Sequence, residues 1–474
     1  MGIDDLLKGV KTAAVFCNQF GDTGKGKFSD YLASSWADVI ARGTGGNNAG
    51  HTVVVGDKEK IFHLIPAGIL SDCEGKITVL GNGMVIDLAV LSGELDELDD
   101  EGFSYNNLRI SEDANVIMPY HIGLDKTKNQ SQKNGGIGST GRGIGPCYTD
   151  KIARRGIVVR DLFDVDRLSS KLDNLREIYR QIKPDEVIAG LAHFINRIKP
   201  FVRDTVSEMH RFKREGKKIL LEGAQGLLLS IEHGTYPYVT SSDCSLNGMA
   251  SGVGLSARDV DLPLGLIKFP FMTRVGAGPF PTELGGGSSE KHCSSGNTLV
   301  EELESYGIPH EIKDGRVLYD RKHSQINDMI NSSNEFYQGI GIRLAAGEYG
   351  ATTGRPRRVG WTDAVAAKYA VGINGPIFVL TKPDCLSDAS KFNLVYEYNV
   401  QGKPVDTFSR NDRSLRNAKP VIKSYEGYGN IGDVRSYERL PQSLKSAIGD
   451  FERFTGGSVA IVSVGATRDQ TIVR

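Results

Sequence analysis

The chain has 474 residues, of which 39% are hydrophobic and 24% charged, an ordinary composition for a globular protein. Its 57 basic and 58 acidic side chains give a formal net charge of −1, which excludes a general electrostatic attraction to nucleic acid or to anionic membranes. Six scattered cysteines without a Cys-x-x-Cys pair, no apolar run near the roughly 20 residues of a membrane helix, and no signal-peptide pattern predict a cytoplasmic protein.

The first predicted strand is residues 12–17, TAAVFC, which lead into the loop GDTGKGK at 21–27. Residues 28–36 then carry Phe28, Tyr31, Leu32 and Trp36 at helical spacing. A strand, a glycine-rich loop and a helix in this order direct the amides of the helix N-terminus towards phosphate. Further strands are predicted at DVIAR, residues 38–42, and at KITVLGNGMVID, residues 76–87, and each runs into glycines.

Residues 161–216 have a helical pattern, in which Leu168, Leu172, Leu175 and Tyr179 share one face. Later strands are predicted in KKILLEGAQG, in PIFVLTKPD and in GGSVAIVSVG, and each ends in a polar or glycine-rich loop. Alternating strands and helices predict an α/β fold with a large, mostly parallel central sheet and surrounding helices. Ligands of such folds bind at the carboxyl ends of the strands.

The loop from Gly21 to Lys27 is shorter than the standard phosphate loop, but its glycines and lysines are able to wrap phosphate. The alternative is a strand-to-helix turn with solvated lysines. Asp22 lies inside the loop, where a carboxylate repels phosphate unless it binds Mg²⁺ or takes a proton. Its alternative interpretation is an aspartate that forms a turn or caps a helix.

Four other blocks contain candidate ligand-binding residues. GGNNAGHT, residues 45–52, offers two asparagines and His51, although a lone histidine is more often structural. GSTGRGIGP, residues 138–146, followed by Arg154 and Arg155, is a second candidate anion site or a solvated loop. LEGAQG places Gln225 at a strand end, and TYPYVTSSD supplies hydroxyl groups.

Two blocks near the C-terminal end suggest carboxylate and guanine recognition. GATTGRPRR, residues 350–358, packs three arginines and two threonines together, which suits bidentate binding of carboxylate or phosphate. Its alternative is a solvated basic loop. TKPD, residues 381–384, resembles a signature in which an aspartate accepts hydrogen bonds from guanine N1 and N2.

Taken in order, these blocks closely resemble the adenylosuccinate synthetase family from about residue 12 to the C-terminus. The resemblance implies a phosphate-loop NTPase-like synthetase fold, with one domain over residues 1–474 that is interrupted at 288–346, a probable insertion with its own helices. It further implies a ligase of purine biosynthesis that joins aspartate to C6 of IMP. By the same resemblance, the reaction is expected to require GTP and Mg²⁺, to pass through a 6-phosphoryl-IMP intermediate, and to give adenylosuccinate, GDP and phosphate. The family also implies a cytoplasmic homodimer with small-molecule substrates and no nucleic-acid or membrane partner.

The resemblance implies roles for individual residues. Asp22 matches the base that removes the N1 proton of IMP, His51 the acid at the leaving phosphate oxygen, and Lys25 a group that stabilises the transferring phosphoryl group; Gln225 is the fourth catalytic candidate. The implied Mg²⁺ ligands are Asp22 and the carbonyl of Gly50. The implied GTP-binding residues are Gly21, Thr23, Gly24, Lys25, Gly26, Lys27, Gly50, His51, Thr52, Lys382, Asp384, Ser463 and Gly465. The implied IMP-binding residues are Asp22, Asn48, Thr140, Gln225, Thr240, Arg355 and, from a second subunit, Arg154. The implied aspartate-binding residues are Thr352, Thr353, Arg355 and Arg357.

The chain departs from the usual family pattern in three places: Phe20 replaces Trp, Thr23 replaces Glu, and residues 240–245 read TSSDCS. A viral branch of the superfamily shares the Thr and the Asp-Cys segment and acts on dGMP, but it usually lacks the aspartate that Asp22 matches. We favour IMP because Asp22 and His51 are retained. The alternative is GMP or dGMP as substrate, with a 2-amino-(deoxy)adenylosuccinate as product.

Two interpretations from other classes are a nucleotide-binding regulator without catalysis and an unrelated phosphate-loop kinase. The retained Asp22, Lys25 and His51 argue against the regulator. The arginine cluster at 355–358 argues against the kinase, because a simple kinase needs no second carboxylate site.

Overall fold

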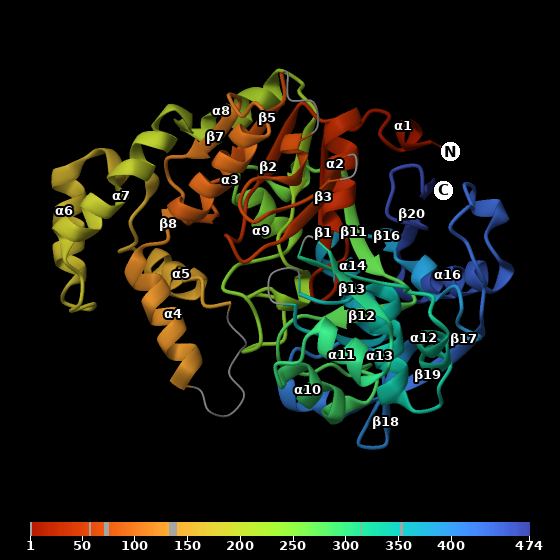
Figure 1. Cartoon of the computed structure of the whole chain (residues 1–474). Coiled ribbons are helices and arrows are strands. Elements are labelled where there is room, and N and C mark those ends of the chain that lie inside the picture. The colour runs from red at the N-terminus through yellow and green to blue at the C-terminus, as the bar shows by residue number, and fades with distance from the viewer. Residues whose placement is uncertain (1, 56–57, 71–74, 132–139, 314, 351–353) are drawn as a thin grey trace. The chain divides into compact units, whose positions relative to one another are not determined.

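The computed structural model describes residues 2–55, 58–70, 75–131, 140–313, 315–350 and 354–474. Figure 1 shows the order of its helices and strands along the chain. The chain divides into two units, which are treated separately below. Unit 1 comprises residues 1–8, 17–23 and 265–474, and unit 2 comprises residues 9–16 and 24–264.

Unit 2 contains a parallel sheet whose described strands follow the order β1-β10-β2-β5-β7-β9. Their bounds are β1 Thr12–Cys17, β2 Val39–Arg42, β5 Ile77–Leu80, β7 Leu108–Ser111, β9 Val202–Arg203 and β10 Ile219–Glu222. Every residue of β1 and β10 is buried, as expected for parallel strands that are covered on both faces. The strands predicted at 12–17 and 38–42 are therefore confirmed, as is the strand in KKILLEGAQG.

Helices and short strands surround this sheet (Figure 1). The helices are α2 Lys25–Ser35, α3 Leu88–Asp100, α4 Pro119–Ser131, α5 Ile144–Ile152, α6 Val165–Leu175, α7 Pro184–Ile198, α8 Thr205–Arg214 and α9 Leu246–Ser251. The short strands are β3 His51–Val55, β4 Lys58–Phe62, β6 Val85–Ile86 and β8 Asn115–Val116. The helical pattern at 161–216 is in fact three helices with short breaks and the strand β9. One break falls before Pro184, which begins α7 because proline suits the first turn of a helix.

Besides a two-stranded hairpin described below, the described residues of unit 1 form two larger sheets. In the first, β11, β16 and β20 are parallel and β21 is antiparallel to β20. In the second, β12, β15, β17 and β18 are neighbours and β19 pairs with β17. The bounds are β11 Leu262–Lys268, β12 Phe271–Arg274, β15 Arg358–Asp363, β16 Ile377–Thr381, β17 Lys391–Val400, β18 Lys403–Val405, β19 Ala418–Glu426, β20 Ser458–Ser463 and β21 Thr471–Val473.

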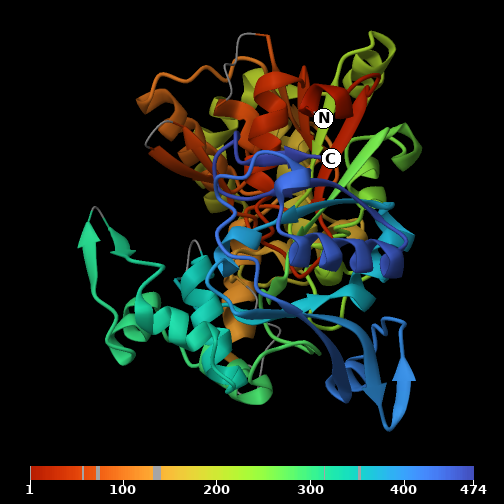
Figure 2. The same ribbon diagram turned by 90° about the vertical axis from the view of Figure 1, so that its right-hand side faces the viewer.

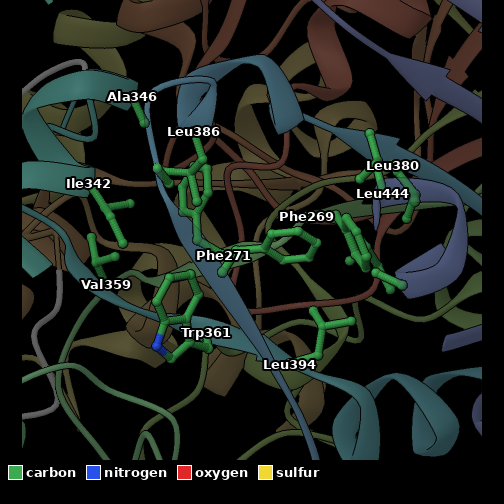
Figure 3. Packing of buried hydrophobic residues seen from close by; sticks show 14 of the residues in the cluster. Phe269, Phe271, Ile342, Ala346, Val359, Trp361, Leu380, Leu386, Leu394 and Leu444 are labelled. Carbon is green, nitrogen blue, oxygen red and sulfur yellow. The ribbon is translucent and has the colours of Figure 1, made fainter. Parts of the chain in front are cut away.

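One apolar cluster fills the interior of unit 1. Figure 3 shows the rings of Phe269 and Phe271 between Leu386 on one side and Leu380 and Leu444 on the other, with the Trp361 ring below them, and each of these six side chains is almost fully buried. The helices of this unit are α1 Ile3–Leu6, α10 Gly286–Ser294, α11 Leu299–Ser305, α12 Ser324–Ile330, α13 Glu335–Ala346, α14 Ala364–Asn374, α15 Asp412–Arg416 and α16 Gln442–Thr455. The strands predicted in PIFVLTKPD and GGSVAIVSVG are confirmed as β16 and β20.

The segment at 288–346 contains α11, α12, α13 and most of α10. It also contains the hairpin of β13 His310–Lys313 and β14 Arg316–Tyr319. Figure 2 shows this hairpin extending away from the helices of the same segment. Helices α12 and α13 pack against each other, and Leu303, Ile326 and Ile340 join the core of unit 1. The segment has helices of its own, as expected, while its status as an insertion stays a prediction.

Three glycines of unit 2 meet where the ends of β2, β5 and α9 converge. A Cβ atom on Gly252 would lie 1.6 Å from the carbonyl oxygen of Gly43, and one on Gly83 would lie 2.0 Å from the same oxygen. The Gly83 amide donates to the Gly252 carbonyl over 2.9 Å. No side chain fits between these backbones, so the three glycines fix the ends of these elements against one another.

The expected α/β class, with a large and mostly parallel sheet and surrounding helices, is confirmed. Within the described part of the chain, none of the helices combines the length and the apolar character that a membrane crossing requires.

Candidate functional site

The loop between β1 and α2 has the backbone of a tight turn. Gly21, Asp22 and Gly24 have φ values of 92°, 50° and 78°, and the left-handed region is costly for Asp22 because it has a Cβ atom. Gly24 is the N-cap of α2, whose first turn contains neither a capping side chain nor an acidic residue. The first amide groups of α2 are therefore not neutralised by its own side chains, which favours an anion there.

Lys25 begins α2 and is buried. Its ammonium donates a hydrogen bond to the carbonyl oxygen of Gln225 over 2.8 Å. Gln225 itself has a φ of 50°, so the chain turns sharply just after β10. Lys25 and the strand-end Gln225 are therefore in contact within unit 2. Lys27 differs, because its ammonium lies 5.5 Å from the ring centroid of Phe28.

The side-chain amide of Gln225 is buried, and neither its oxygen nor its nitrogen has a hydrogen-bond partner among the described residues. A Cβ atom on Gly45 would lie 3.0 Å from the Gln225 Oε1, so glycine lets the GGNNAG backbone approach this amide closely. Buried polar groups without partners are rare in native proteins. Such an amide beside a glycine-rich loop is typical of a site that a polar ligand completes.

Asn48 and Thr240 meet in unit 2: the Asn48 Nδ2 donates to the Thr240 Oγ1 over 3.2 Å, and the Asn48 Oδ1 accepts from the Gly46 amide over 3.2 Å. The structure thus brings together two of the residues that were expected to bind IMP. Asp243, in the unusual TSSDCS block, accepts hydrogen bonds from the hydroxyls of Ser230 and Ser245, each over 2.9 Å. Its carboxylate therefore holds neighbouring loops together.

Asp22 belongs to unit 1, where it lies beside two cations. Arg357 contacts its Oδ2 atom, and the Lys268 Nζ lies 3.9 Å from the same atom. The completely buried carboxylate of Glu348 holds both cations, with Lys268 at 2.5 Å and Arg357 at 3.2 Å. Glu348 also contacts the Lys382 Nζ at 2.5 Å. Two carboxylates and three cations thus form a network with a net positive charge.

Burial and charge change the proton affinities of this network. Burial lowers the pKa of Lys268 to about 8 and that of Arg357 to about 10, because the charged forms lose their hydration. Burial raises the pKa of Glu348, but Lys268 and Lys382 outweigh that effect, so it lies below its usual value. Glu348 is therefore ionised at neutral pH and balances the cations that surround it.

The residues expected around guanine lie at the carboxyl ends of two neighbouring strands. Thr381 of β16 and Ser463 of β20 are register partners, and Lys382 and Asp384 follow Thr381 directly. The Ser463 hydroxyl donates to the carbonyl of Gly465 over 3.2 Å. This edge of a parallel sheet is where α/β proteins usually bind ligands.

Of the remaining predicted residues, some are exposed, some are buried, and others lie outside the described residues. Thr140, Arg154 and Arg355 are exposed, and Arg154 has a φ of 61° in the turn after α5. Gly50 is exposed directly before β3, and Gly26 is buried in α2. Thr23 is fully buried, and its hydroxyl has no partner among the described residues. His51 and Thr52 begin β3, but their side chains, like Thr352 and Thr353 as a whole, lie outside the described residues.

The described residues contain no group of three or more His, Cys, Asp or Glu side chains that could hold a metal ion. Mg²⁺ does not need such a cage, because it usually binds one or two carboxylates together with substrate phosphates and water. The side chain of Asp22 is 37% exposed, so it remains accessible to a cation. The donor set of a single carboxylate beside a phosphate-type loop therefore fits magnesium.

Sequence reasoning did not select Glu348 or Lys268, although they join Asp22, Arg357 and Lys382 into one network. A signal existed for each. Lys268 is a charged residue at the end of the apolar strand β11, and Glu348 lies two residues before the GATTGRPRR block. A fully buried charge at the end of a strand requires a partner, and here the two residues are partners of each other.

Comparisons with known proteins agree with this geometry. The family model described as adenylosuccinate synthetase matches residues 14–472. Curated proteins named adenylosuccinate synthetase from Clostridium perfringens and Frankia casuarinae are each 40% identical; the first match covers 96% of both chains, and the second covers 96% of this chain and 97% of its relative.

Two solved structures are also similar. A fully ligated adenylosuccinate synthetase from Plasmodium falciparum has a TM-score of 0.80 and 29% identity, and the match covers 98% of this chain and all of the other. A succinoaminodeoxyadenylate synthetase of cyanophage S-2L, bound to dGMP and dATP, has a TM-score of 0.55 and 18% identity, with 98% and 95% coverage. At that identity the second likeness concerns the fold alone.

Proposed function

Because the chain belongs to the adenylosuccinate synthetase family, a family of C–N bond-forming ligases, we propose that it joins aspartate to C6 of IMP with GTP as phosphoryl donor. The unpartnered amide of Gln225 carries this proposal most directly: it is buried beside Gly45 and Lys25 and needs a polar ligand to complete it. The products are adenylosuccinate, GDP and phosphate. We place the enzyme in the cytoplasm as a homodimer.

The first chemical step activates the purine. The carboxylate of Asp22 takes the N1 proton of IMP, and the negative charge moves to O6. That oxygen then attacks the γ-phosphorus of GTP and GDP leaves, so the poor 6-oxo leaving group becomes a phosphate ester. The left-handed backbone of Asp22 and the two cations beside it fix the direction of its carboxylate.

The phosphate loop stabilises the charge that develops during transfer. Lys25 and the first amides of α2 carry positive charge towards the phosphates, and His51 protonates the leaving oxygen. Magnesium, held by Asp22 and the carbonyl of Gly50, would neutralise the phosphate oxygens when bound. Lys25 is already fixed by its hydrogen bond to Gln225, so little rearrangement is needed for its part in the step.

The second step is attack of the aspartate amine on C6, from which phosphate leaves. We assign the carboxylates of aspartate to Thr352, Thr353, Arg355 and Arg357. The guanidinium of Arg357 is mostly buried, which strengthens its attraction for a carboxylate.

We assign the two nucleotides to two different groups of residues. Asn48, Thr240, Thr140 and Gln225 hold IMP, while Arg154 reaches the IMP phosphate of the partner subunit. Lys382, Asp384, Ser463 and Gly465 hold guanine. The hydrogen bond between Asn48 and Thr240, and the pairing of the strands that precede Asp384 and Gly465, support these assignments.

IMP is favoured over GMP and dGMP. Asp22 is present to act as the base, and Asp243 of the unusual TSSDCS block already accepts from the Ser230 and Ser245 hydroxyls. An additional 2-amino group on the substrate would need an acceptor of its own. The features shared with the viral branch therefore do not outweigh Asp22.

A matrix of substrates tests this proposal. The purified chain is assayed for aspartate-dependent phosphate release with IMP, GMP or dGMP, each with GTP or ATP, and the products are identified by mass. We expect the highest kcat/KM with IMP and GTP, and no phosphate release when aspartate is omitted. A higher kcat/KM with dGMP would replace the proposed substrate, and aspartate-independent transfer would contradict a ligase.

A further inference from the structure

Glu302, on the helix α11 within the segment 288–346, is 1% exposed. Its Oε1 accepts a hydrogen bond from the Arg343 Nη1 over 2.7 Å and lies 2.6 Å from the His292 Nε2. Its Oε2 accepts from the hydroxyl of Tyr349. Burying an ionised carboxylate is costly unless it is paired and hydrogen-bonded, so this group is held in a fixed position by three partners.

Through the hydrogen-bond partners of its two carboxylate oxygens, Glu302 is connected to both ends of one loop. Tyr349 lies directly before the GATTGRPRR block, and it forms an antiparallel bridge with Pro356 near the other end of the block. Arg343 uses its Nε atom to donate to the carbonyl oxygen of Arg357 over 3.0 Å. One carboxylate therefore fixes the entry of the loop through Tyr349 and its exit through Arg343.

We propose that Glu302 is a positioning residue for the amino-acid substrate, because it holds the loop whose arginines bind the aspartate carboxylates. This inference rests on the proposed function, which assigns Arg355 and Arg357 to aspartate. Arginine recognises a carboxylate through two parallel hydrogen bonds, so a small shift of its backbone lowers affinity strongly. The contact at the Arg357 carbonyl controls that backbone without touching the substrate.

The position of Arg357 makes the effect specific. Its guanidinium contacts Asp22 and lies 3.2 Å from Glu348, while its amide donates to the Glu348 carbonyl over 3.0 Å. Glu302 and Arg343 supply the remaining support, on the carbonyl side. Losing that support should disturb aspartate binding more than the binding of GTP, which involves other elements.

Glu302→Gln tests the proposal, with Glu304→Gln as the matched control. Glu304 lies on the same helix but is exposed. Steady-state kinetics are measured with aspartate, IMP and GTP varied in turn, and thermal unfolding is followed by circular dichroism. We expect the KM for aspartate to rise about tenfold in Glu302→Gln, with kcat and the KM for GTP changed by less than about threefold. The KM for IMP should rise less than that for aspartate, because Arg355 is the one residue of this loop that is also assigned to IMP. Glu304→Gln should match the wild type.

Two further variants keep the test decisive if Glu302→Gln does not fold. Tyr349→Phe removes one hydroxyl and keeps the ring, so it should raise the aspartate KM by a smaller factor. Arg343→Lys keeps the charge but cannot reach Glu302 and the Arg357 carbonyl together, so it should behave like Glu302→Gln. The double variant of Glu302→Gln and Arg343→Lys should be no worse than either single variant, because both break one connection.

The outcomes separate the two proposals. A wild-type enzyme with no aspartate-dependent phosphate release would overturn the proposed function and this inference with it. An active wild type whose aspartate KM is the same in Glu302→Gln and Tyr349→Phe would overturn this inference alone. Equal losses in all three KM values and in thermal stability would also overturn it, since they indicate a general structural role.

Discussion

The ammonium nitrogen of Lys268 lies 2.5 Å from a carboxylate oxygen of Glu348, and both side chains are completely buried. The cost of burying these charges is reduced because Glu348 also accepts hydrogen bonds from Lys382 and Arg357, so that one carboxylate pairs with three cations. The hydroxyl of Thr273 accepts another hydrogen bond from Lys268 over 2.7 Å. The charge balance of the whole network therefore depends on Glu348.

Replacing Glu348 by Gln should destabilise the protein. The variant leaves Lys268 charged and buried without its anionic partner, which costs on the order of 3 kcal/mol. Urea unfolding at pH 7 measures the change, and Glu311→Gln, an exposed position in the same unit, is the control. A Glu348→Gln variant as stable as the control would contradict the claim that Glu348 is needed to compensate the buried charge of Lys268.

The buried Asp363 should make stability depend on pH. Burial raises the pKa of its carboxyl to about 6, against the hydrogen bonds from the Tyr398 hydroxyl and the Ala366 amide. Between the ordinary value of about 4 and the folded value, the native state binds more protons than the unfolded state. The contribution of this group is therefore favourable at low pH and is lost as the pH rises through 6.

Asp363→Asn removes that titration; its single amide oxygen keeps the hydrogen bond from the Ala366 amide, and its NH2 group donates to the Tyr398 hydroxyl in place of accepting from it. Relative to the wild type, its free energy of unfolding should improve by about 2 kcal/mol between pH 4 and pH 7. Urea unfolding at the two pH values gives the difference, and the exposed Asp433→Asn serves as control. The prediction fails if the stability difference is the same at both pH values.

Asp22→Asn should remove the base of the first step. We expect kcat to fall by at least about a hundredfold, because an amide does not take the N1 proton. GTP binding measured by calorimetry should persist, and the exposed Asp100→Asn should leave kcat unchanged. Turnover above about a hundredth of the wild-type value would contradict the assignment of the base.

Asp384→Asn should weaken the preference for GTP over ATP. A carboxylate accepts from both N1 and N2 of guanine, whereas an amide has one acceptor and brings a donor into the same place. We expect the ratio of kcat/KM values for the two nucleotides to fall by about tenfold or more. Asp388→Asn, exposed and four residues further along the chain, is the control, and an unchanged ratio in Asp384→Asn would argue for a different guanine contact.

Mixing two inactive variants tests the shared site. Arg154→Ala and Asp22→Asn should each be almost inactive alone. In a mixed dimer one site receives both wild-type residues, so activity should reappear after the two proteins are mixed and allowed to exchange subunits. Mixtures that stay inactive, although exchange is shown by mass, would place Arg154 in its own subunit's site or outside it.

Local sequence patterns predicted the strands and loops well. The strands β1, β2 and β10 and the helix α2 lie where apolar runs and helical spacing placed them, because burial on both faces of a parallel sheet leaves a continuous apolar signature. The region 161–216 was less well predicted, since helical periodicity does not show where a chain breaks into α6, α7 and α8.

The residues of the candidate site were likewise predicted only in part. Residues inside glycine-rich blocks, such as Asp22 and Gln225, were found because their spacing is itself a signal. Lys268, Glu302 and Glu348 were missed, since their importance depends on partners up to 80 positions away along the chain. The role of a charged residue that is buried by tertiary packing becomes visible only when its partner is known.

The junction of Gly43, Gly83 and Gly252 affects how mutational data on this protein should be understood. Any side chain at Gly43, Gly83 or Gly252 would collide with the backbone of another segment. A scan of all substitutions would therefore score these positions as intolerant of change, as it would catalytic residues such as Asp22 and Lys25. None of the three carries a functional group. A ranking by intolerance alone would thus group these glycines with the catalytic residues. Assays that measure the yield of folded protein separately from the turnover per folded molecule would distinguish the two classes.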